Sequence, residues 1–314
     1  MTVTVLVPSW RRSHLLPRLI GSLRLQEFLP EEIVVAGRTD DEQTKDVVDA
    51  AGDSEGPAVR WIPVDRPGFL APIQTAMNYI RTEIVAIIDD DATPDTSWLE
   101  RLRLPFADPK VACVGGRVIE PGKQPLRISR RAGQVTWFGQ YVGQIGHLSP
   151  PSLLEVHSVM EGNCAWQTDV LRSLEFEPIF DLDDALNYGL DLCLQAKSRG
   201  YRIIYAPEAT VTHQTARPYA LDDLQWRLDR AFVSGRNVTY IGLRRYEPFR
   251  RAIFLPWWVL VGERQSYGLI KAAWDFPRSP RATALLLLAS MRGRKQGLRF
   301  WLDYQRIARQ PLSE

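Results

Sequence analysis

Short apolar runs alternate with longer amphipathic segments through the first 120 residues of the chain. Five runs of strand length are rich in branched side chains: residues 2–8, 32–36, 59–64, 83–88 and 111–118. Apolar residues at helical spacing fill the segments between them: residues 15–25, 42–51, 71–81 and 97–106. This alternation predicts an α/β fold with a mostly parallel, Rossmann-like central sheet flanked by helices. Such sheets bind their ligands in the crevice at the carboxyl ends of the strands.

One of these runs ends in three consecutive carboxylates. The sequence IVAIIDDDATP, residues 84–94, places five apolar residues directly before Asp89, Asp90 and Asp91. We therefore expect the three carboxylates at the carboxyl edge of the sheet. Adjacent carboxylates repel one another, and oxygen ligands of this kind suit Mg²⁺ or Mn²⁺. The pattern predicts a cation site completed by a substrate diphosphate, and the alternative is a solvated acidic turn.

Six segments, taken in their order and spacing, resemble the family-2 glycosyltransferases of the GT-A fold. The segments are VLVPSWRR (5–12), EIVVAGRTDDEQT (32–44), RPGFLAPIQTAMNYI (66–80), IIDDDATPDTSWLE (87–100), EGNCAWQTDVL (161–171) and GYRIIYAPEATVTHQ (200–214). The resemblance implies a GT-A catalytic domain over residues 1–216. Its nucleotide-sugar half would be residues 1–118 and its acceptor half residues 119–216.

The resemblance also implies a role for each matching residue. The nucleotide sugar would be bound by Pro8, Ser9, Arg11, Asp40, Arg66, Gly68, Gln74, Asp89 and Asp90. Asp41 is the alternative to Asp40 in the loop that would meet the base of the nucleotide. Asp91 and His213 would hold a Mn²⁺ or Mg²⁺ ion that bridges the two phosphates. For His213 the alternative is a structural histidine.

The catalytic base is the point at which the chain departs from the family pattern. Family members carry a Glu-Asp pair shortly before an Asp-Leu at the start of a helix, and the Asp of the pair is the base. Aligning that Asp-Leu on residue 191 puts Tyr188 and Gly189 where the pair is expected. We therefore predict Asp191 as the base, with Asp184 and Asp183 in the preceding turn as alternatives. Asp191 could instead be a helix N-terminal residue, stabilised only by the helix dipole.

The resemblance implies a metal-dependent glycosyltransferase that moves a sugar from a nucleotide-diphosphate sugar to an acceptor hydroxyl, with inversion, and we expect it to act in bacterial polysaccharide or glycolipid synthesis. A saccharide or lipid-linked acceptor would meet Gly162 and Asn163, on a side that residues 124–152 help to shape. One alternative is a nucleotide-sugar-binding relative that has lost its base. Another is a haloacid-dehalogenase-like phosphatase, in which Asp89 of IIDDDAT is the nucleophile and Asp91 the acid.

Charge divides the chain at Arg217. Residues 1–216 contain 21 basic and 29 acidic residues, a net charge of −8, whereas residues 217–314 contain 18 and 8, a net charge of +10. We predict a basic, tryptophan-rich helical extension over residues 217–314, in which the apolar runs 252–262 and 282–291 are too short to span a bilayer. Such runs favour peripheral contact with a membrane surface rather than a nucleic-acid partner. Helices that only cover the catalytic domain are the alternative.

The N-terminus and the cysteines bear on the compartment. The first eight residues have neither the basic segment nor the cleavage site of a signal peptide. Cys113, Cys164 and Cys193 have no paired spacing, so neither a disulfide framework nor a zinc site is indicated. We expect a cytoplasmic protein that contacts, at most, the cytoplasmic face of the membrane.

Overall fold

The computed structural model describes residues 1–52, 55–121, 132–143, 145–183, 185–213, 223–263 and 265–308. The chain forms two compact units. The first consists of Met1–Gln134, Val142–Glu177 and Tyr188–Arg217, and the second of Val135–Tyr141, Pro178–Asn187 and Pro218–Glu314. The division into residues 1–216 and 217–314 stays a prediction, because two short segments of the first part group with the helical second unit.

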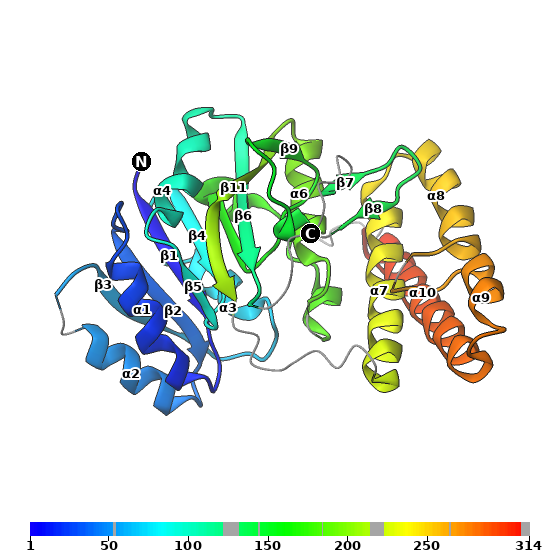
Figure 1. The fold of residues 1–314 in the computed structure, drawn as a ribbon, viewed down its shortest axis with the longest axis horizontal. Helices are drawn as coiled ribbons and strands as arrows, with labels where there is room; N and C mark the ends of the chain where they lie inside the picture. The colour runs from blue at the N-terminus through cyan, green and yellow to red at the C-terminus, as the bar shows by residue number, and fades with distance from the viewer. Residues whose placement is uncertain are drawn as a thin grey trace, which may run out of the picture. The chain divides into compact units, whose positions relative to one another are not determined.

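A mixed nine-stranded sheet forms the centre of the first unit, with the strand order β3-β2-β1-β4-β10-β6-β11-β5 and with β9 beside β11 (Figure 1). Its strands are β1 (Val3–Pro8), β2 (Glu32–Arg38), β3 (Ala58–Val64), β4 (Ile84–Ile88), β5 (Ala92–Pro94), β6 (Val111–Ile119), β9 (Leu154–Val156), β10 (Asn163–Gln167) and β11 (Arg202–His213). A separate pair consists of β7 (Gln134–Val135) and β8 (Tyr141–Val142). All five strands expected in the first 120 residues are present, and β1 to β4 run parallel to one another as predicted.

The second half of the sheet departs from the parallel pattern. β10 lies antiparallel between β4 and β6, so the fifth predicted strand is not a direct neighbour of the fourth. β5 and β9 also pair antiparallel with β11. These pairings join segments far apart in the chain, and the spacing of apolar residues carries no information about them.

Helices cover both faces of this sheet, which explains why β4 is buried at all five of its residues. The helices of the first unit are α1 (Leu16–Arg24), α2 (Glu42–Gly52), α3 (Ala71–Met77), α4 (Trp98–Arg103), α5 (Thr168–Ser173) and α6 (Tyr188–Ser198). Val5 of β1 belongs to one core cluster with Leu19 of α1 and Trp98 of α4. On the other face, Ile87 of β4 lines a cavity together with Ile73 of α3 and with side chains of α6.

The 3-10 helices of the chain are Ser13–Leu15, Leu104–Ala107, Ile145–His147 and Pro178–Asp181. Two of them border predicted helices, so α1 begins at Leu16 after a 3-10 turn and α4 passes into one at Leu104. α3 ends at Met77, four residues before the predicted end. Helix boundaries vary by this amount because terminal turns tighten or fray.

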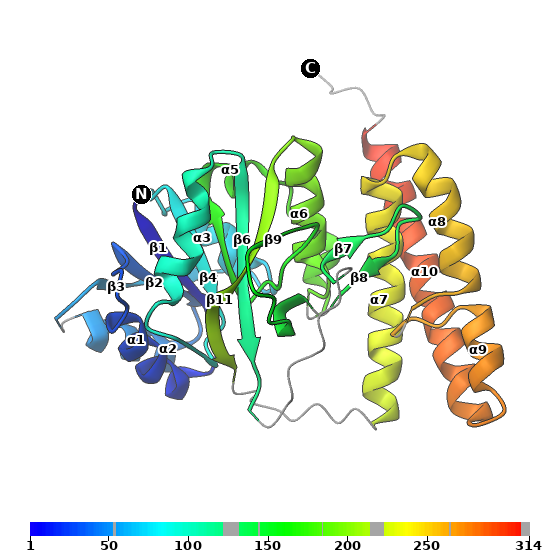
Figure 2. The ribbon, with the colours of Figure 1, turned by 45° about the horizontal axis from the view of Figure 1, so that its top comes forward.

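The second unit contains α7 (Leu224–Arg245), α8 (Pro248–Leu260), α9 (Leu269–Asp275) and α10 (Pro280–Ala308). α7 and α10 lie side by side in both views (Figures 1 and 2). Their backbones approach closely, since a Cβ at Gly293 would lie 2.1 Å from the carbonyl oxygen of Phe232 and one at Gly297 would lie 2.3 Å from that of Arg236. The predicted apolar runs fall in α8 and α10. No helix in the described part of the chain has both the length and the hydropathy needed to cross a bilayer.

Candidate active site at the carboxyl edge of the sheet

The acidic triplet (Asp89, Asp90 and Asp91) follows β4 where the chain turns into β5. The loops after β1, β2 and β3 leave the same edge, because these strands run parallel to β4 or to one another. A hydrogen bond to the residue just before β10 holds the backbone of Asp89, since the Asp89 N–H donates to the carbonyl oxygen of Gly162 at 3.2 Å. The charge of the triplet therefore lies at the predicted edge of the sheet.

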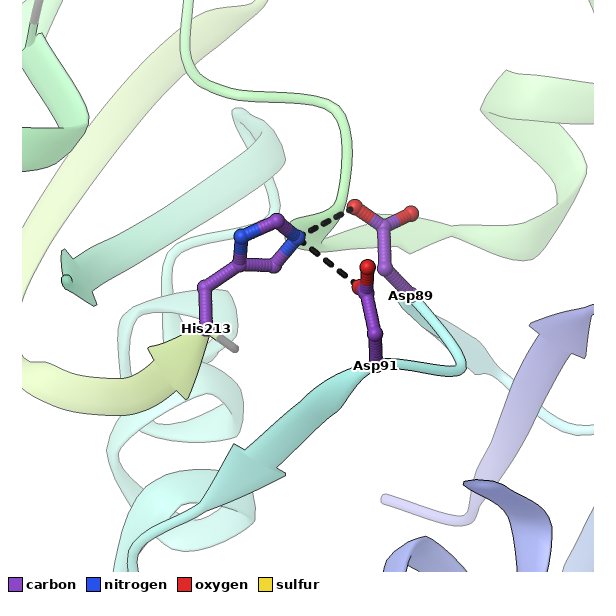
Figure 3. Close-up of side chains that lie close together, drawn as sticks. All are labelled: Asp89, Asp91 and His213. Carbon is purple, nitrogen blue, oxygen red and sulfur yellow. Dashed lines mark ion pairs between the residues drawn. The ribbon is translucent and has the colours of Figure 1, made fainter. Parts of the chain in front are cut away.

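His213 reaches the triplet because β11 pairs with β5 in a register that sets His213 opposite Ala92. Its Nε2 lies 2.8 Å from Oδ1 of Asp91 and 3.8 Å from Oδ2 of Asp89. Figure 3 shows the three side chains pointing toward one another. One ligand atom from each of them lies within 4.8 Å of the other two. Two carboxylates and an imidazole so arranged form a candidate site for a divalent cation.

Asp90 has different partners and is 5% exposed. Its Oδ2 accepts a hydrogen bond from the hydroxyl of Ser9 at 2.8 Å, and Nη1 of Arg12 donates to its Oδ1 at 2.8 Å. The same nitrogen lies 3.4 Å from Oδ2 of Asp91. The middle carboxylate thus fixes the turn to the loop after β1, while the first and third carboxylates face His213.

The electrostatics of the triplet favour an added cation. Desolvation by the surrounding protein, followed by the charge of Asp91, raises the pKa of Asp89 to about 6. The hydrogen bond to Asp91 raises the pKa of His213. Desolvation also acts to raise the pKa of Asp91, but the hydrogen bond and charge of His213 bring it below its ordinary value. Negative charge is crowded at this site, so a divalent cation would lower the energy of the ionised carboxylates.

The loop after β1 contains three predicted nucleotide-binding residues. Pro8 ends β1 opposite Ala36, and Ser9 is 5% exposed and donates its hydroxyl to Asp90. Arg11 has a φ of 56° and its side chain is 66% exposed. Its guanidinium lies over the ring of Trp10, 4.8 Å from the centroid. Of the three, Arg11 is the side chain that a solvent-borne ligand can meet.

In the loop after β2, the structure distinguishes between the two aspartates that the sequence left as alternative contacts to the nucleotide. Asp40 is half exposed, and its carboxylate lies 4.0 Å from Nη2 of Arg11 and 3.5 Å from Nε of Arg38. Asp41 is 5% exposed and accepts hydrogen bonds from the N–H of Arg11 and from the hydroxyl of Thr44 in the first turn of α2. Asp41 is thus used in forming the loop, and Asp40 stays the predicted contact to the nucleotide.

The loop after β3 brings together three further predicted residues. The guanidinium of Arg66 donates to Oε1 of Gln74 in α3. Gly68 has a φ of 134°, a conformation that side chains rarely adopt. Phe69, which is 48% exposed, has its ring centroid 6.3 Å from that of Tyr188 at the start of α6. The structure therefore places Arg66, Gly68 and Gln74 at the same edge of the sheet as the triplet.

The two predicted acceptor-side residues differ in what they contact. Gly162 packs directly on Asp89, because a Cβ at residue 162 would lie 1.9 Å from Oδ2 of that carboxylate. Asn163 is fully buried: its Oδ1 accepts from Nε1 of Trp98 at 2.7 Å, and its Nδ2 donates to the carbonyl oxygens of Arg117 at 3.0 Å and Ala209 at 3.3 Å. Asn163 therefore links β10 to β6 and β11. Its contact with an acceptor stays a prediction that its burial does not favour.

The predicted bases differ in their surroundings. Asp191 lies in the first turn of α6, is 1% exposed and accepts from Nε2 of Gln195 at 2.8 Å. Asp183 belongs to the second unit, where its carboxylate lies 2.6 Å from Nη2 of Arg236. Asp184 lies outside the described residues, as do residues 124–131 of the predicted acceptor-side stretch. The identity of the base stays a prediction for all three aspartates.

Two residues of the site were missed from the sequence. Arg12, next to the predicted Arg11, contacts both Asp90 and Asp91. Glu161, next to the predicted Gly162, accepts a hydrogen bond from the N–H of Gly189 at 3.0 Å. Neither contact could be read from the sequence, because Arg12 is 78 residues from Asp90 and Glu161 is 28 residues from Gly189 along the chain.

A sequence profile of the family described as "Glycosyltransferase like family 2" matches residues 2–227. The chain belongs to this family. The match includes every strand of the large sheet and every residue of the triplet and its histidine. It confirms the resemblance stated from the sequence, and the position of the triplet after the fourth strand rather than the first argues against the phosphatase alternative.

Among curated relatives of this family member, the pre-mycofactocin glycosyltransferase of Mycobacterium tuberculosis is 27% identical over 237 residues. The alignment covers 74% of the present chain and 46% of the relative, so the chain spans about half the length of the curated relatives that it matches.

Two solved structures have a similar fold. The mannosyltransferase PcManGT from Pyrobaculum calidifontis, in complex with GDP-Man and Mn²⁺, superimposes with a TM-score of 0.56 at 18% identity, over 94% of this chain and 86% of its own. S. aureus TarS 1-349 in complex with UDP gives a TM-score of 0.58 at 15% identity, over 100% and 93%. The predicted GT-A fold is confirmed by these likenesses, which at such identities concern the fold alone.

Proposed function

We propose that the chain transfers a sugar from a nucleotide-diphosphate sugar to an acceptor hydroxyl, and that Asp89, Asp91 and His213 hold a divalent cation for this reaction. The observation that carries the proposal is the convergence of the three side chains, with ligand atoms within 4.8 Å of one another, at the carboxyl edge of a GT-A sheet. Strand ends of this kind are the usual ligand site of open α/β sheets.

The donor set fits the proposed cation. Two carboxylate oxygens and one imidazole nitrogen suit Mn²⁺, and carboxylates also suit Mg²⁺. A structural neighbour of the chain is described with GDP-Man and Mn²⁺, and another with UDP, which supports a nucleotide-diphosphate donor. When bound, the cation would offset the charge that develops on the diphosphate.

The chain's own residues would orient the donor. Ser9 and Arg12 hold Asp90, so the turn that presents Asp89 and Asp91 is fixed before the ligand binds. Half-exposed Asp40 and exposed Arg11 would meet the nucleoside from the two neighbouring loops. Inversion at the anomeric carbon follows if the acceptor attacks from the side opposite the diphosphate.

Peripheral contact of the second unit with a membrane is part of the same proposal, and a lipid-linked acceptor would suit it. Large apolar side chains are exposed on and beside α9: Ile270 at 59%, Trp274 at 72% and Phe276 at 51%. Phe249 at the start of α8 is 76% exposed. The net charge of +10 over residues 217–314 would add attraction to anionic lipids. Assembly of a bacterial polysaccharide or glycolipid stays the predicted context.

The test is calorimetric titration of the protein with UDP, GDP and dTDP, each with and without Mn²⁺. We expect one of the three to bind in a Mn²⁺-dependent manner, and Asp91→Asn to weaken that binding roughly 100-fold or more, since even partners of metal ligands affect affinity 10- to 100-fold. The control is Asp49→Asn, which makes the same chemical change at a half-exposed side chain on α2. Nucleotide binding that is equally strong without Mn²⁺, or in Asp91→Asn, would contradict the proposal.

A further inference from the structure

The proposed transfer requires a proton acceptor that the cation does not occupy. The acceptor hydroxyl oxygen forms a bond to the anomeric carbon, and the bond from that carbon to the diphosphate oxygen breaks, with its electron pair leaving on the diphosphate. The hydroxyl proton must pass to a basic group as this happens. A side chain that plays this part has to be close to the triplet, reachable by a ligand, and outside the cluster of Asp89, Asp91 and His213.

We infer that Glu161 is this base. The inference rests on the proposed function, and it assigns the proton-accepting step to a residue at the end of the loop before β10. Its next neighbour along the chain, Gly162, is packed against Asp89, so the backbone at Glu161 adjoins the triplet. Glu161 is half-buried rather than fully enclosed.

The position of the Glu161 side chain is the main argument. A Cβ added at Gly189 would lie 2.4 Å from Cγ, 2.8 Å from Cδ and 2.8 Å from Oε1 of Glu161. The carboxyl carbon of an aspartate lies one C–C bond, about 1.5 Å, from its Cβ. The Glu161 carboxylate therefore overlaps the volume that an aspartate at residue 189 would fill. The register that places the family's Asp-Leu at residue 191 puts the missing aspartate of the Glu-Asp pair at this same residue.

The Glu161 side chain shares a small cavity with the start of α6. Glu161, Tyr188 and Gly189 line a cavity whose other walls are mainly apolar, with Ile73, Ile87 and Leu171 among them. Burial, followed by the charges of Glu161 and other groups that include Asp89, raises the pKa of Tyr188, which places this ring within the fields of both carboxylates. The ring of Tyr188 is therefore close both to Glu161, which lies outside the cation cluster, and to Asp89 of the triplet.

Asp191, the base predicted from the sequence, is less well placed for this step. It lies on the same helix as Gly189, but it is 1% exposed and its carboxylate accepts from Gln195. An acceptor hydroxyl cannot reach it without a change in the packing of α6. Glu161 is half-buried rather than 1% exposed.

Glu161 could alternatively serve α6 only as a cap, because it accepts the N–H of Gly189 in the first turn. Glu161→Gln separates these two roles. A glutamine keeps an oxygen that accepts the N–H of Gly189, so capping survives, but an amide cannot take a proton from an acceptor at neutral pH. Glu155→Gln, a matched change on β9 of the same unit, is the control.

The experiment measures nucleotide release from UDP-glucose and GDP-mannose in the presence of Mn²⁺, with water as the acceptor. We expect Glu161→Gln to lower kcat roughly 100-fold or more while donor affinity and thermal stability stay at the wild-type level. Addition of sodium azide should restore release in Glu161→Gln, because the azide anion attacks the anomeric carbon without losing a proton. Release that azide does not restore would overturn the inference.

A second test moves the carboxylate from residue 161 to residue 189. Gly189→Asp alone should impair folding or activity, because its Cβ meets Glu161, and Glu161→Ala alone should remove turnover. The double variant should release nucleotide faster than either single variant, since the clash is gone and a carboxylate has returned to the same volume. A double variant no better than Glu161→Ala would count against Glu161 as the base.

The outcomes separate this inference from the proposed function. Failure of the wild-type protein to bind any nucleotide diphosphate with Mn²⁺ would end both. Wild-type binding and turnover, together with unchanged turnover in Glu161→Gln, would leave the function standing and overturn the inference. Loss of turnover in Asp191→Asn, with turnover kept in Glu161→Gln, would assign the base to Asp191 instead.

Discussion

Substitution of Gly162 by alanine tests whether packing against the glycine holds Asp89 in place as a cation ligand. In the structure the added Cβ would lie 1.9 Å from Oδ2 and 2.4 Å from Cγ of Asp89. Ordinary contact begins at 3.4 Å, and the difference between 3.4 Å and 1.9 Å requires the carboxylate oxygen to move by 1.5 Å. The Asp89 side chain is 46% exposed, so it can rotate toward solvent without disturbing β4.

The expected loss follows from the geometry of metal binding. Ligand distances in such sites are held within about 0.2 Å, so a displacement of 1.5 Å removes Asp89 from the coordination shell. Changes beyond the ligands themselves already cost 10- to 100-fold in affinity, and we expect at least this loss for Mn²⁺, or roughly 1.4–2.8 kcal/mol. Stability should fall by no more than about 1.5 kcal/mol, the strain of one displaced rotamer.

The assay is calorimetric titration with Mn²⁺, alongside thermal denaturation. Gly21→Ala is the matched control, because nothing lies within 4 Å of its added Cβ on α1 and the exchange should stabilise the helix by about 0.5–1 kcal/mol. Asp89→Asn should weaken Mn²⁺ binding without steric change. Wild-type affinity for Mn²⁺ in a folded Gly162→Ala protein would refute the view that this contact positions a ligand.

Two further predictions concern stability and membranes. Asn163→Ala removes three buried hydrogen bonds and leaves the indole N–H of Trp98 unpaired, so urea denaturation should show a loss of about 3–5 kcal/mol in the free energy of unfolding; a loss below about 1 kcal/mol would be inconsistent with this role. Replacement of both Ile270 and Trp274 by serine should reduce co-sedimentation with phosphatidylglycerol vesicles roughly tenfold or more, whereas Leu29→Ser, on the first unit, should not change it. Equal sedimentation of all three proteins would exclude α9 as the contact.

Local patterns predicted much of the first unit. Five apolar runs became strands, because branched side chains in short bounded runs suit a sheet that is buried on both faces. The triplet could be placed at the carboxyl edge because β4 comes directly before it. The expectation for His213 came from a family resemblance, and its approach to Asp91 depends on the pairing of β11 with β5.

Contacts between distant segments could not be read in this way. Arg12 lies 78 residues from Asp90 along the chain, and the sequence contains no periodicity that joins them. The insertion of β10 between β4 and β6 brings Gly162 against Asp89, whereas the first 120 residues suggested a simple succession of parallel neighbours. Spacing predicts which elements form, and long-range pairing decides which side chains meet.

Glu161 and Gly189 illustrate how residues far apart in the chain can supply a carboxylate to the same place. Under the inference above, residue 161 supplies the carboxylate that the family pattern has at the position of residue 189. The two positions are 28 residues apart, yet the side chain of one fills the space beside the backbone of the other. A carboxylate supplied from the strand side needs a glycine on the helix, since any Cβ at residue 189 would collide with Glu161. A carboxylate supplied from the helix needs a smaller residue at position 161. The effects of changing the two residues should therefore depend on each other, and the double variant is the direct measure of that dependence.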